Sequence, residues 1–187
     1  SVGIEDVNLF EQGITVMSGV SGKAFMAGAG IAFLTAEKDM WVQENYRELY
    51  KSYSLSEIIP YHKKGMFRNT PTGSTFLDFF ESLKYFRKYF YKLQSQRETQ
   101  MNLIREVFGK YSIHPIAPKG KLSKANSTFI VEQNFKEKYL EKMRKNNFIV
   151  YVPAIPNAIQ ISTFGDINMK SIHKFTRLTE RMLEKYL

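Results

Sequence analysis

The strongest pattern in the chain is a helical repeat of aromatic and aliphatic residues between Ser74 and about Lys110. Apolar side chains recur there at steps of three and four residues, while Lys84, Lys88 and Lys92 fall on another face. The apolar positions are Phe76, Phe79, Phe80, Leu83, Phe86, Phe90 and Leu93. This spacing predicts one long amphipathic helix, with its apolar face on a core and its lysines in solvent.

The sequence on the two sides of this helix has different patterns, which indicates two parts. Before it, residues 14–18 and 30–35 are compact apolar runs bounded by glycine or polar turns, as is typical of short buried strands. After Gly109 the expected order is strand, strand, helix, strand, strand, helix, at residues 113–117, 127–132, 136–146, 148–152, 159–163 and 168–186. We therefore expect an α/β chain in which residues 1–109 form one part, including the connecting helix. Residues 110–187 are expected to form a small α+β domain with its helices on one face of the sheet.

The segment between the second strand and the long helix has weaker signals. Residues 37–50 have helical spacing. Residues 51–71 are polar and contain Pro60, Gly65 and Pro71, which predicts a long loop. Loops of this length inside compact domains are often functional.

Composition and charge limit the partners that the chain can have. The net charge of +9 favours anionic partners such as phosphorylated ligands, nucleic acid or an anionic membrane surface. Most basic residues alternate with acids, however, as on ordinary solvated helix faces. The absence of cysteine fits a reducing compartment, and the longest apolar run, residues 24–34, is too short for a membrane helix. We therefore expect a cytoplasmic protein that binds neither nucleic acid nor membrane.

The glycine-rich run from Ser18 to Ala24 is the best candidate for chemistry. It departs from a phosphate-binding P-loop, because Met17 stands where a glycine is needed and Ala24 where a serine or threonine is needed. What remains is Lys23, directly after a strand and among small residues, in surroundings that favour a desolvated, imine-forming amine. A lysine in an ordinary surface turn is the alternative that the pattern leaves open. Three widely separated histidines give no support for a metal site: His62, His114 and His173.

Several segments together resemble the class V aminotransferase family, whose members are pyridoxal 5′-phosphate (PLP) enzymes of fold type I. Residues 13–34 resemble the lysine region: a strand, a serine-rich turn, the lysine, a glycine-rich segment and a second strand. Residues 52–55 resemble the loop that leads to the partner subunit's active site, and residues 67–72 resemble a Thr-Pro motif before a long helix. Residues 147–151 and 159–167 are most similar to the C-terminal strand pair of 2-aminoethylphosphonate:pyruvate transaminases.

This resemblance implies a cofactor, a reaction and an assembly. Lys23 would hold PLP as a Schiff base and, once freed, would shuttle a proton between the substrate and cofactor carbons, with PLP as the electron sink. Thr70 would reach the PLP phosphate of the neighbouring subunit in a homodimer, and Ser18 or Ser21 would contact the same phosphate. The implied reaction transfers an amino group from an amine, such as 2-aminoethylphosphonate or an amino acid, to a keto acid.

Three positions depart from the family pattern. Gln160 stands where an arginine usually grips the substrate carboxylate, and an amide cannot reproduce that bidentate fork. Gly22 replaces a common Asn or Gln, and Gly73 a frequent histidine. In the family, the aspartate at the pyridine nitrogen, the ring-stacking residue and a phosphate loop all precede the lysine. We therefore expect a piece of a longer protein, inactive alone. A non-catalytic binding or assembly protein on the same fold is the alternative.

Overall fold

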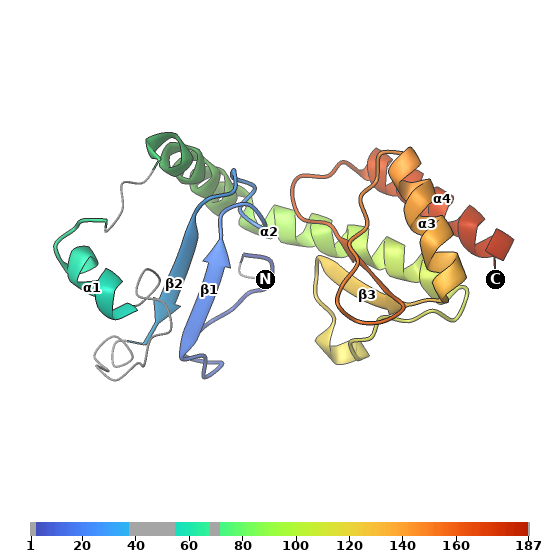
Figure 1. Cartoon of the computed structure of the whole chain (residues 1–187), viewed down its shortest axis with the longest axis horizontal. Helices are drawn as coiled ribbons and strands as arrows, with labels where there is room; N and C mark the ends of the chain where they lie inside the picture. Colours follow the sequence, from blue (N-terminus) through green and yellow to red (C-terminus); the bar gives the residue numbers. More distant parts are fainter. Residues whose placement is uncertain (1–2, 38–54, 68–71, 187) are drawn as a thin grey trace. The chain divides into compact units, whose positions relative to one another are not determined.

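The computed structural model of the protein describes residues 3–37, 55–67 and 72–186 (Figure 1). Contacts divide the chain into two compact units, Ser1–Arg87 and Lys88–Leu187, which we call the first and the second unit. Helix α2 (Gly73–Gly109) contributes to both units. Its bounds confirm the long helix expected from the sequence. The domain boundary placed near Gly109 stays a prediction.

The first unit is built on an antiparallel strand pair. Strands β1 (Val16–Val20) and β2 (Ala32–Ala36) pair so that Val16 lies opposite Ala36 and Val20 opposite Ala32. Both strands form close to their predicted positions, although each begins two residues later than expected. The predicted helix at residues 37–50 lies almost wholly outside the described residues.

Helix α1 (Leu55–Lys63) corrects the prediction of a continuous loop over residues 51–71. Pro60 was taken as a sign of a loop, but it lies inside this helix. A proline at this position removes one intrahelical hydrogen bond and crowds the carbonyl four residues earlier, yet the helix continues to Lys63. The resemblance to an active-site loop at residues 52–55 falls mostly outside the described residues.

An aromatic cluster forms the core of the first unit. The ring of Phe25 lies 5.5 Å from that of Phe33, 5.7 Å from Phe79 and 4.8 Å from Phe86, measured between centroids. The expectation that Phe80 belongs to the same apolar face was wrong, since its side chain is 55% exposed and the Lys84 ammonium lies 4.3 Å above its ring. Consecutive helical residues point about 100° apart, so Phe79 and Phe80 cannot both face this cluster.

The second unit joins the C-terminal part of α2 to two strands and two helices. These elements are β3 (Asn126–Ile130), α3 (Gln133–Lys145), β4 (Ala158–Ser162) and α4 (Met169–Tyr186), with a short turn of 3-10 helix, η3 (Lys119–Lys121). Strands β3 and β4 are antiparallel, and Phe129 lies opposite Ile159. The predicted order is therefore present for one strand before each helix, with α3 beginning three residues earlier than expected.

Two of the four strands predicted in this unit are reduced to single bridges. Pro115 bridges to Phe129, and Tyr151 bridges to Gln160. Proline has no N–H to donate to a ladder, which limits the first of these segments. The described part of the chain therefore has two regular strands here, flanked on each side by an irregular segment.

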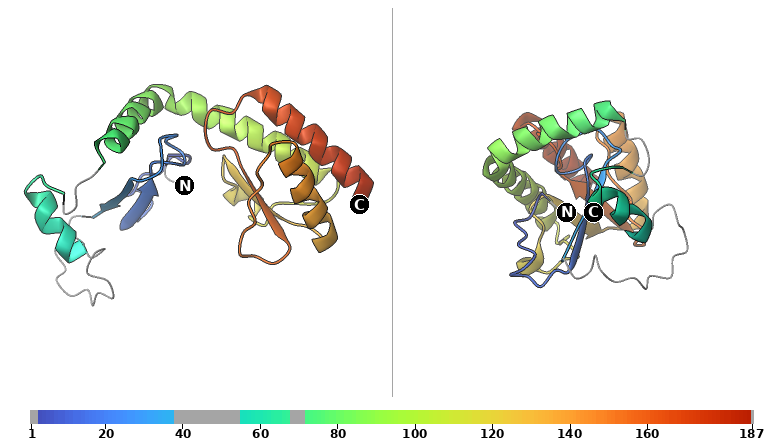
Figure 2. Two further views of the ribbon diagram at one scale, coloured as in Figure 1. Left: turned by 45° about the horizontal axis from the view of Figure 1, so that its top comes forward. Right: turned by 90° about the vertical axis from the view of Figure 1, so that its left-hand side faces the viewer.

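One hydrophobic core holds the second unit together. Figure 2 shows from two further sides the ribbons of the strands and helices that contribute to it. It draws on α2, β3, α3, β4 and α4, and Phe108 stacks on Phe129 with ring centroids 4.2 Å apart. Phe129, Ile159 and Ile161 lie on one face of the strand pair and pack on the helices, which is the predicted arrangement. No helix in the described segments is long and apolar enough to cross a lipid bilayer.

Candidate functional site

Lys23 lies on the connection between β1 and β2, and Ser21 closes the base of that connection. The Ser21 side chain is buried. Its backbone N–H donates to the Ile31 carbonyl at 2.9 Å, and its hydroxyl donates to the Gly28 carbonyl at 2.7 Å. The hydroxyl oxygen also accepts from the Ile31 N–H at 3.3 Å. Ser21 therefore links the two ends of the connection formed by residues 21–31, and its hydroxyl both donates and accepts a hydrogen bond within it.

Two further contacts fix the middle of the connection within the first unit. Phe25 inserts into the aromatic cluster. The Gly28 N–H donates to the Asp78 carboxylate on α2, and a Cβ added at Gly28 would lie only 3.0 Å from that oxygen. No sequence pattern indicated this role for Asp78, because a lone acid near the start of a helix is common on solvated surfaces.

The Lys23 side chain itself is exposed, which corrects the expectation of a desolvated amine among the described residues. Ala24 and Phe25 are buried, whereas Gly22 and Lys23 face outward. The Met26 N–H donates to the Lys23 carbonyl at 3.1 Å, and Met26 has a positive φ of 61°, which is uncommon for a side chain of its size. The described residues therefore hold the backbone at Lys23 in a defined turn but do not enclose its amine.

The other predicted cofactor contacts of this region differ in what they can offer a phosphate. Ser18 lies in the middle of β1, opposite Leu34, and is exposed. The Ser21 hydroxyl already donates its one proton in a hydrogen bond to the Gly28 carbonyl, and a hydrogen bond to a phosphate oxygen would need that same proton. Thr70 lies outside the described residues. A Cβ at Gly22 would make only ordinary contacts with Ala29, so space does not require the glycine there.

Gln160 lies in the second unit, on the face of the strand pair that points away from the core. Its neighbours Ile159 and Ile161 are buried in the core, so the alternation of a strand directs Gln160 to the other face. Thr128 lies directly opposite it on β3. On its other side, Tyr151 and Gln160 exchange two backbone hydrogen bonds of 3.0 and 2.8 Å. Thr128, Gln160 and Tyr151 thus form a row of neutral hydrogen-bonding side chains.

Polar side chains of α2 hold the segment that follows β4. Gln96 donates to the Asp166 carboxylate at 3.3 Å and to the Ile167 carbonyl at 2.8 Å, and Gln100 donates to the same carbonyl. Arg97 is almost wholly buried, and this burial lowers the pKa of its guanidinium while the charge of Asp166 opposes the shift. Sequence reasoning missed these residues because it assigned the polar side of α2 to solvent.

Within residues 3–37, 55–67 and 72–186, no group of three or more His, Asp or Glu side chains lies close enough to hold an ion. The chemistry of the described residues therefore centres on an exposed lysine in a fixed turn and on a neutral polar row in the other unit.

Solved structures of aminotransferases match this fold over nearly the whole chain. An aspartate aminotransferase from Thermus thermophilus matches with a TM-score of 0.83 at 18% identity, over 100% of this chain and 54% of that one. An alanine–glyoxylate aminotransferase from Nostoc sp. matches with a TM-score of 0.80 at 11% identity, over 98% and 52%. A cysteine desulfurase from Thermococcus onnurineus matches with a TM-score of 0.74 at 12% identity, over 99% and 51%.

The chain thus spans about half the length of these proteins. Comparison of its sequence with family models and with curated proteins finds no match. The expected fold class is confirmed: the chain has the mixed α/β fold of the C-terminal half of PLP-dependent aminotransferases. At such low identity the likeness shows the fold, and the fold alone does not select a reaction.

Proposed function

We propose that this chain carries the cofactor lysine, Lys23, of a PLP-dependent aminotransferase of class V. In the complete homodimeric enzyme, an amino group would pass from an amine, such as 2-aminoethylphosphonate or an amino acid, to a keto acid. The observation that carries the proposal is the position of Lys23 within a fold shared with aminotransferases over nearly the whole chain. The Lys23 side chain is exposed on a loop that Ser21, Phe25 and Gly28 hold in place.

The described residues fit one part of a PLP site. The exposed Lys23 amine is free to reach an aldehyde, and the exposed Ser18 hydroxyl can donate to a phosphate oxygen. Ser21 could join it only by releasing the Gly28 carbonyl, and Thr70 would act from the neighbouring subunit. Bound PLP would supply the electron sink for the bonds broken at the substrate carbon. Lys23 Nζ would then take a proton from that carbon as a general base and deliver it to the cofactor carbon as a general acid.

The polar row around Gln160 indicates which kind of substrate anion the site would accept. Thr128, Gln160 and Tyr151 offer hydroxyl and amide groups without a cation, so a substrate anion would be held by single hydrogen bonds. Such contacts are weaker for a carboxylate than a bidentate arginine. This favours a substrate whose recognition does not depend on an α-carboxylate, and it also motivates the second candidate, a binding or assembly protein without catalysis.

An absorbance experiment on the full-length protein separates the two candidates. Added PLP should produce an imine band near the visible edge, and borohydride reduction should attach the cofactor covalently to the peptide that contains Lys23. The variant Lys23→Ala should lose both signals. Lys64→Ala, which removes another exposed lysine of the first unit, should keep them. Absence of the band in the unaltered protein would overturn the aminotransferase proposal and leave a binding role.

A second experiment addresses the substrate. Replacing Gln160 by arginine would restore a bidentate partner for a carboxylate. If Gln160 contacts the substrate, Gln160→Arg should lower the KM for α-amino acids by about tenfold or more, since a charge-assisted pair is worth ~1.5–3 kcal/mol. The matched change Ser162→Arg, on the same face but two residues away, should leave the KM unchanged. Equal effects of both variants would remove Gln160 from the proposed site.

A further inference from the structure

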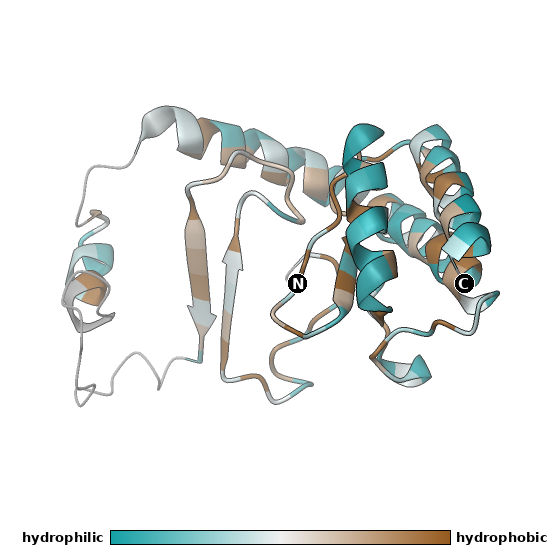
Figure 3. Ribbon diagram, turned by 45° about the vertical axis from the view of Figure 1, so that its right-hand side comes forward, coloured by the Kyte–Doolittle hydropathy of each residue, from teal (hydrophilic) through white to brown (hydrophobic). Residues whose placement is uncertain are grey.

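Helices α3 and α4 each carry a row of exposed cations. On α4 the row repeats at steps of three and four residues, which places its members on one side of the helix. Its members are Lys170, Lys174, Arg177, Arg181 and Lys185. On α3 the row consists of Lys138, Lys142 and Lys145, again at helical spacing. The outward surface of α3 is accordingly almost wholly hydrophilic (Figure 3).

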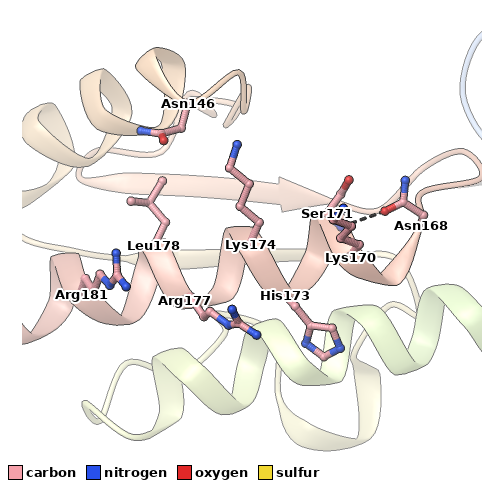
Figure 4. Close-up of a pocket in the computed structure, with 9 residues that line it drawn as sticks. All are labelled: Asn146, Asn168, Lys170, Ser171, His173, Lys174, Arg177, Leu178 and Arg181. Atoms are coloured by element: carbon pink, nitrogen blue, oxygen red, sulfur yellow. Dashed lines mark hydrogen bonds between the residues drawn. The ribbon is translucent and has the colours of Figure 1, made fainter.

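The two rows line two adjoining open hollows, which we together call the α3–α4 groove: the first follows α4 and reaches α3 at Asn146, and the second lies between the two helices. It has two adjoining parts of about 830 and 480 Å³, which share Asn146, Leu178 and Arg181. Figure 4 shows Lys174 extending from α4 toward Asn146 at the end of α3. At the other end, Lys138 Nζ lies 4.6 Å from the centre of the Tyr186 ring.

The charge of this groove is strongly one-sided. The described residues that line it include eight Lys and Arg side chains, and Glu141 is the one carboxylate among them. That carboxylate is paired with Lys145 at 2.5 Å. The groove therefore concentrates a large share of the positive charge of the whole chain, whose net value is +9.

The acidic residues of α4 are engaged elsewhere. Glu180 accepts a hydrogen bond of 2.6 Å from Lys110 at the end of α2, and this bond raises the pKa of Lys110. Glu184 interacts with the Tyr111 hydroxyl, although burial is the larger cause of the raised pKa of Tyr111. Packing of α4 against α2 thus draws acids away from the groove. In the sequence these same acids alternate with the basic residues, so the one-sided row of cations is not evident there.

The length of the row indicates a polymer as the partner. From Lys170 to Lys185 the helix rises by about 22 Å at 1.5 Å per residue. One strand of duplex DNA presents a phosphate every ~3.4 Å along its axis, so the row spans roughly six phosphates. A single phosphorylated metabolite would engage only a small part of it. An extended chain of phosphates matches both the length and the charge.

The side chains of the groove disfavour other anionic partners. A membrane-surface helix needs an exposed apolar face, whereas the large apolar residues of α3 and α4, among them Phe135 and Phe175, are buried in the core. A docked peptide is usually anchored by aromatic or aliphatic side chains in pockets. The ammonium groups of Lys138 and Lys185 lie 4.6 and 5.2 Å from the centre of the Tyr186 ring, where a stacked base would have to displace them.

From these observations we infer that the α3–α4 groove binds the phosphodiester backbone of nucleic acid without reading its sequence. Contacts from Lys and Arg to phosphates fix position and carry no base information. Binding should therefore depend steeply on salt, because each neutralised phosphate releases a counterion. The inference does not rest on the cofactor chemistry proposed for Lys23.

Fluorescence anisotropy with a labelled duplex of random sequence tests this inference on protein that contains the whole chain. The groove variant Lys174→Gln, Arg177→Gln, Arg181→Gln should weaken binding more than about tenfold and make the slope of log K against log salt shallower by about 3. A matched control, Lys64→Gln, Lys119→Gln, Lys121→Gln, removes the same charge from exposed positions outside the groove. It should change the affinity less than about threefold.

The opposite wall gives an independent variant. Lys138→Gln, Lys142→Gln, Lys145→Gln should weaken binding as the α4 variant does, and far-UV circular dichroism checks that each variant is folded. Equal losses in the groove and control variants would show attraction by net charge alone and overturn the inference. Poly-glutamate that competes as well as the duplex at equal charge would also overturn it. Binding to vesicles containing phosphatidylserine, without binding to the duplex, would do the same.

Discussion

The two units of the chain differ in how they are stabilised. In the second unit five elements share one core, and Phe108, Phe129 and Tyr139 are completely buried. The first unit has a two-stranded sheet, and Val16 and Val20 of β1 remain 43% and 42% exposed. An isolated strand pair is marginally stable in water. The candidate lysine therefore lies in the unit with the smaller core among the described residues, where single hydrogen bonds and close contacts matter more.

Truncation of core aromatics in the two units should show this difference most strongly. Phe129→Ala removes a fully buried ring that stacks on Phe108 and should cost about 3–5 kcal/mol in free energy of unfolding. Phe33→Ala removes a half-buried ring of the first unit and should cost under about 2 kcal/mol. Urea unfolding followed by circular dichroism measures both. Equal costs would mean that the two units share one stability.

A glycine of β1 should be the most sensitive small residue of the first unit. A Cβ added at Gly19 would lie 2.2 Å from the Phe33 ring, so Gly19→Ala should force the ring to move and cost about 1–3 kcal/mol. Gly73 at the start of α2 has open space around it, and Gly73→Ala should be neutral or stabilise by less than about 1 kcal/mol. If Gly19→Ala changed the free energy of unfolding as little as Gly73→Ala, the close contact between Gly19 and the Phe33 ring would be contradicted.

The hydrogen bonds of Ser21 should decide the order of the lysine loop. Ser21→Ala removes the side-chain partner of the Gly28 carbonyl and should cost about 1–3 kcal/mol. Proteolysis between residues 21 and 31 should become faster, while sites in the second unit stay protected. Ser18→Ala, at an exposed strand position, is the matched control and should leave the proteolysis rate unchanged. Equal cleavage rates in both variants would show that Ser21 does not fix the loop.

High pH should affect the second unit through Tyr139. Burial raises the pKa of this tyrosine, and its hydrogen bond of 2.9 Å with Thr179 opposes the shift. Above the ordinary value of 10.0, the unfolded state loses the proton while the folded state keeps it, so stability falls as pH rises. The expected loss is about 1.4 kcal/mol per pH unit. Unfolding midpoints between pH 9 and 11 should fall less steeply in Tyr139→Phe, and an unchanged slope would contradict the assignment.

Sequence periodicity predicted the regular elements well where one face is strongly apolar. Helices α2 and α4 were located within about one residue at each end. It failed where a single residue type was given too much weight, as with Pro60 inside α1, or where a side chain lies at the edge of an apolar face, as with Phe80. The bounds of an amphipathic helix follow from fixed spacings along the chain. Whether one side chain is buried, or one proline is tolerated, depends on the residues that surround it in the fold.

The candidate site was predictable only in part, for a similar reason. Lys23 stood out because its glycine-rich turn is a continuous stretch of sequence. Asp78 accepts a hydrogen bond from the N–H of Gly28, which is 50 residues away in the chain. Thr128 and Tyr151 lie beside Gln160 but come from two other segments. No local pattern connects such residues, since the strand register and the path of α2 bring them together.

The sequence by itself determined the helical and strand periods, the turn that carries Lys23 and the excess of positive charge. The tertiary structure alone decided where that charge acts. The basic rows of α3 and α4 lie more than twenty residues apart in the chain and are each mixed with acids. They form one groove because the two helices pack on the same core while Glu180 turns to Lys110. Electrostatic fields depend on distance in space, and only the folded chain sets those distances.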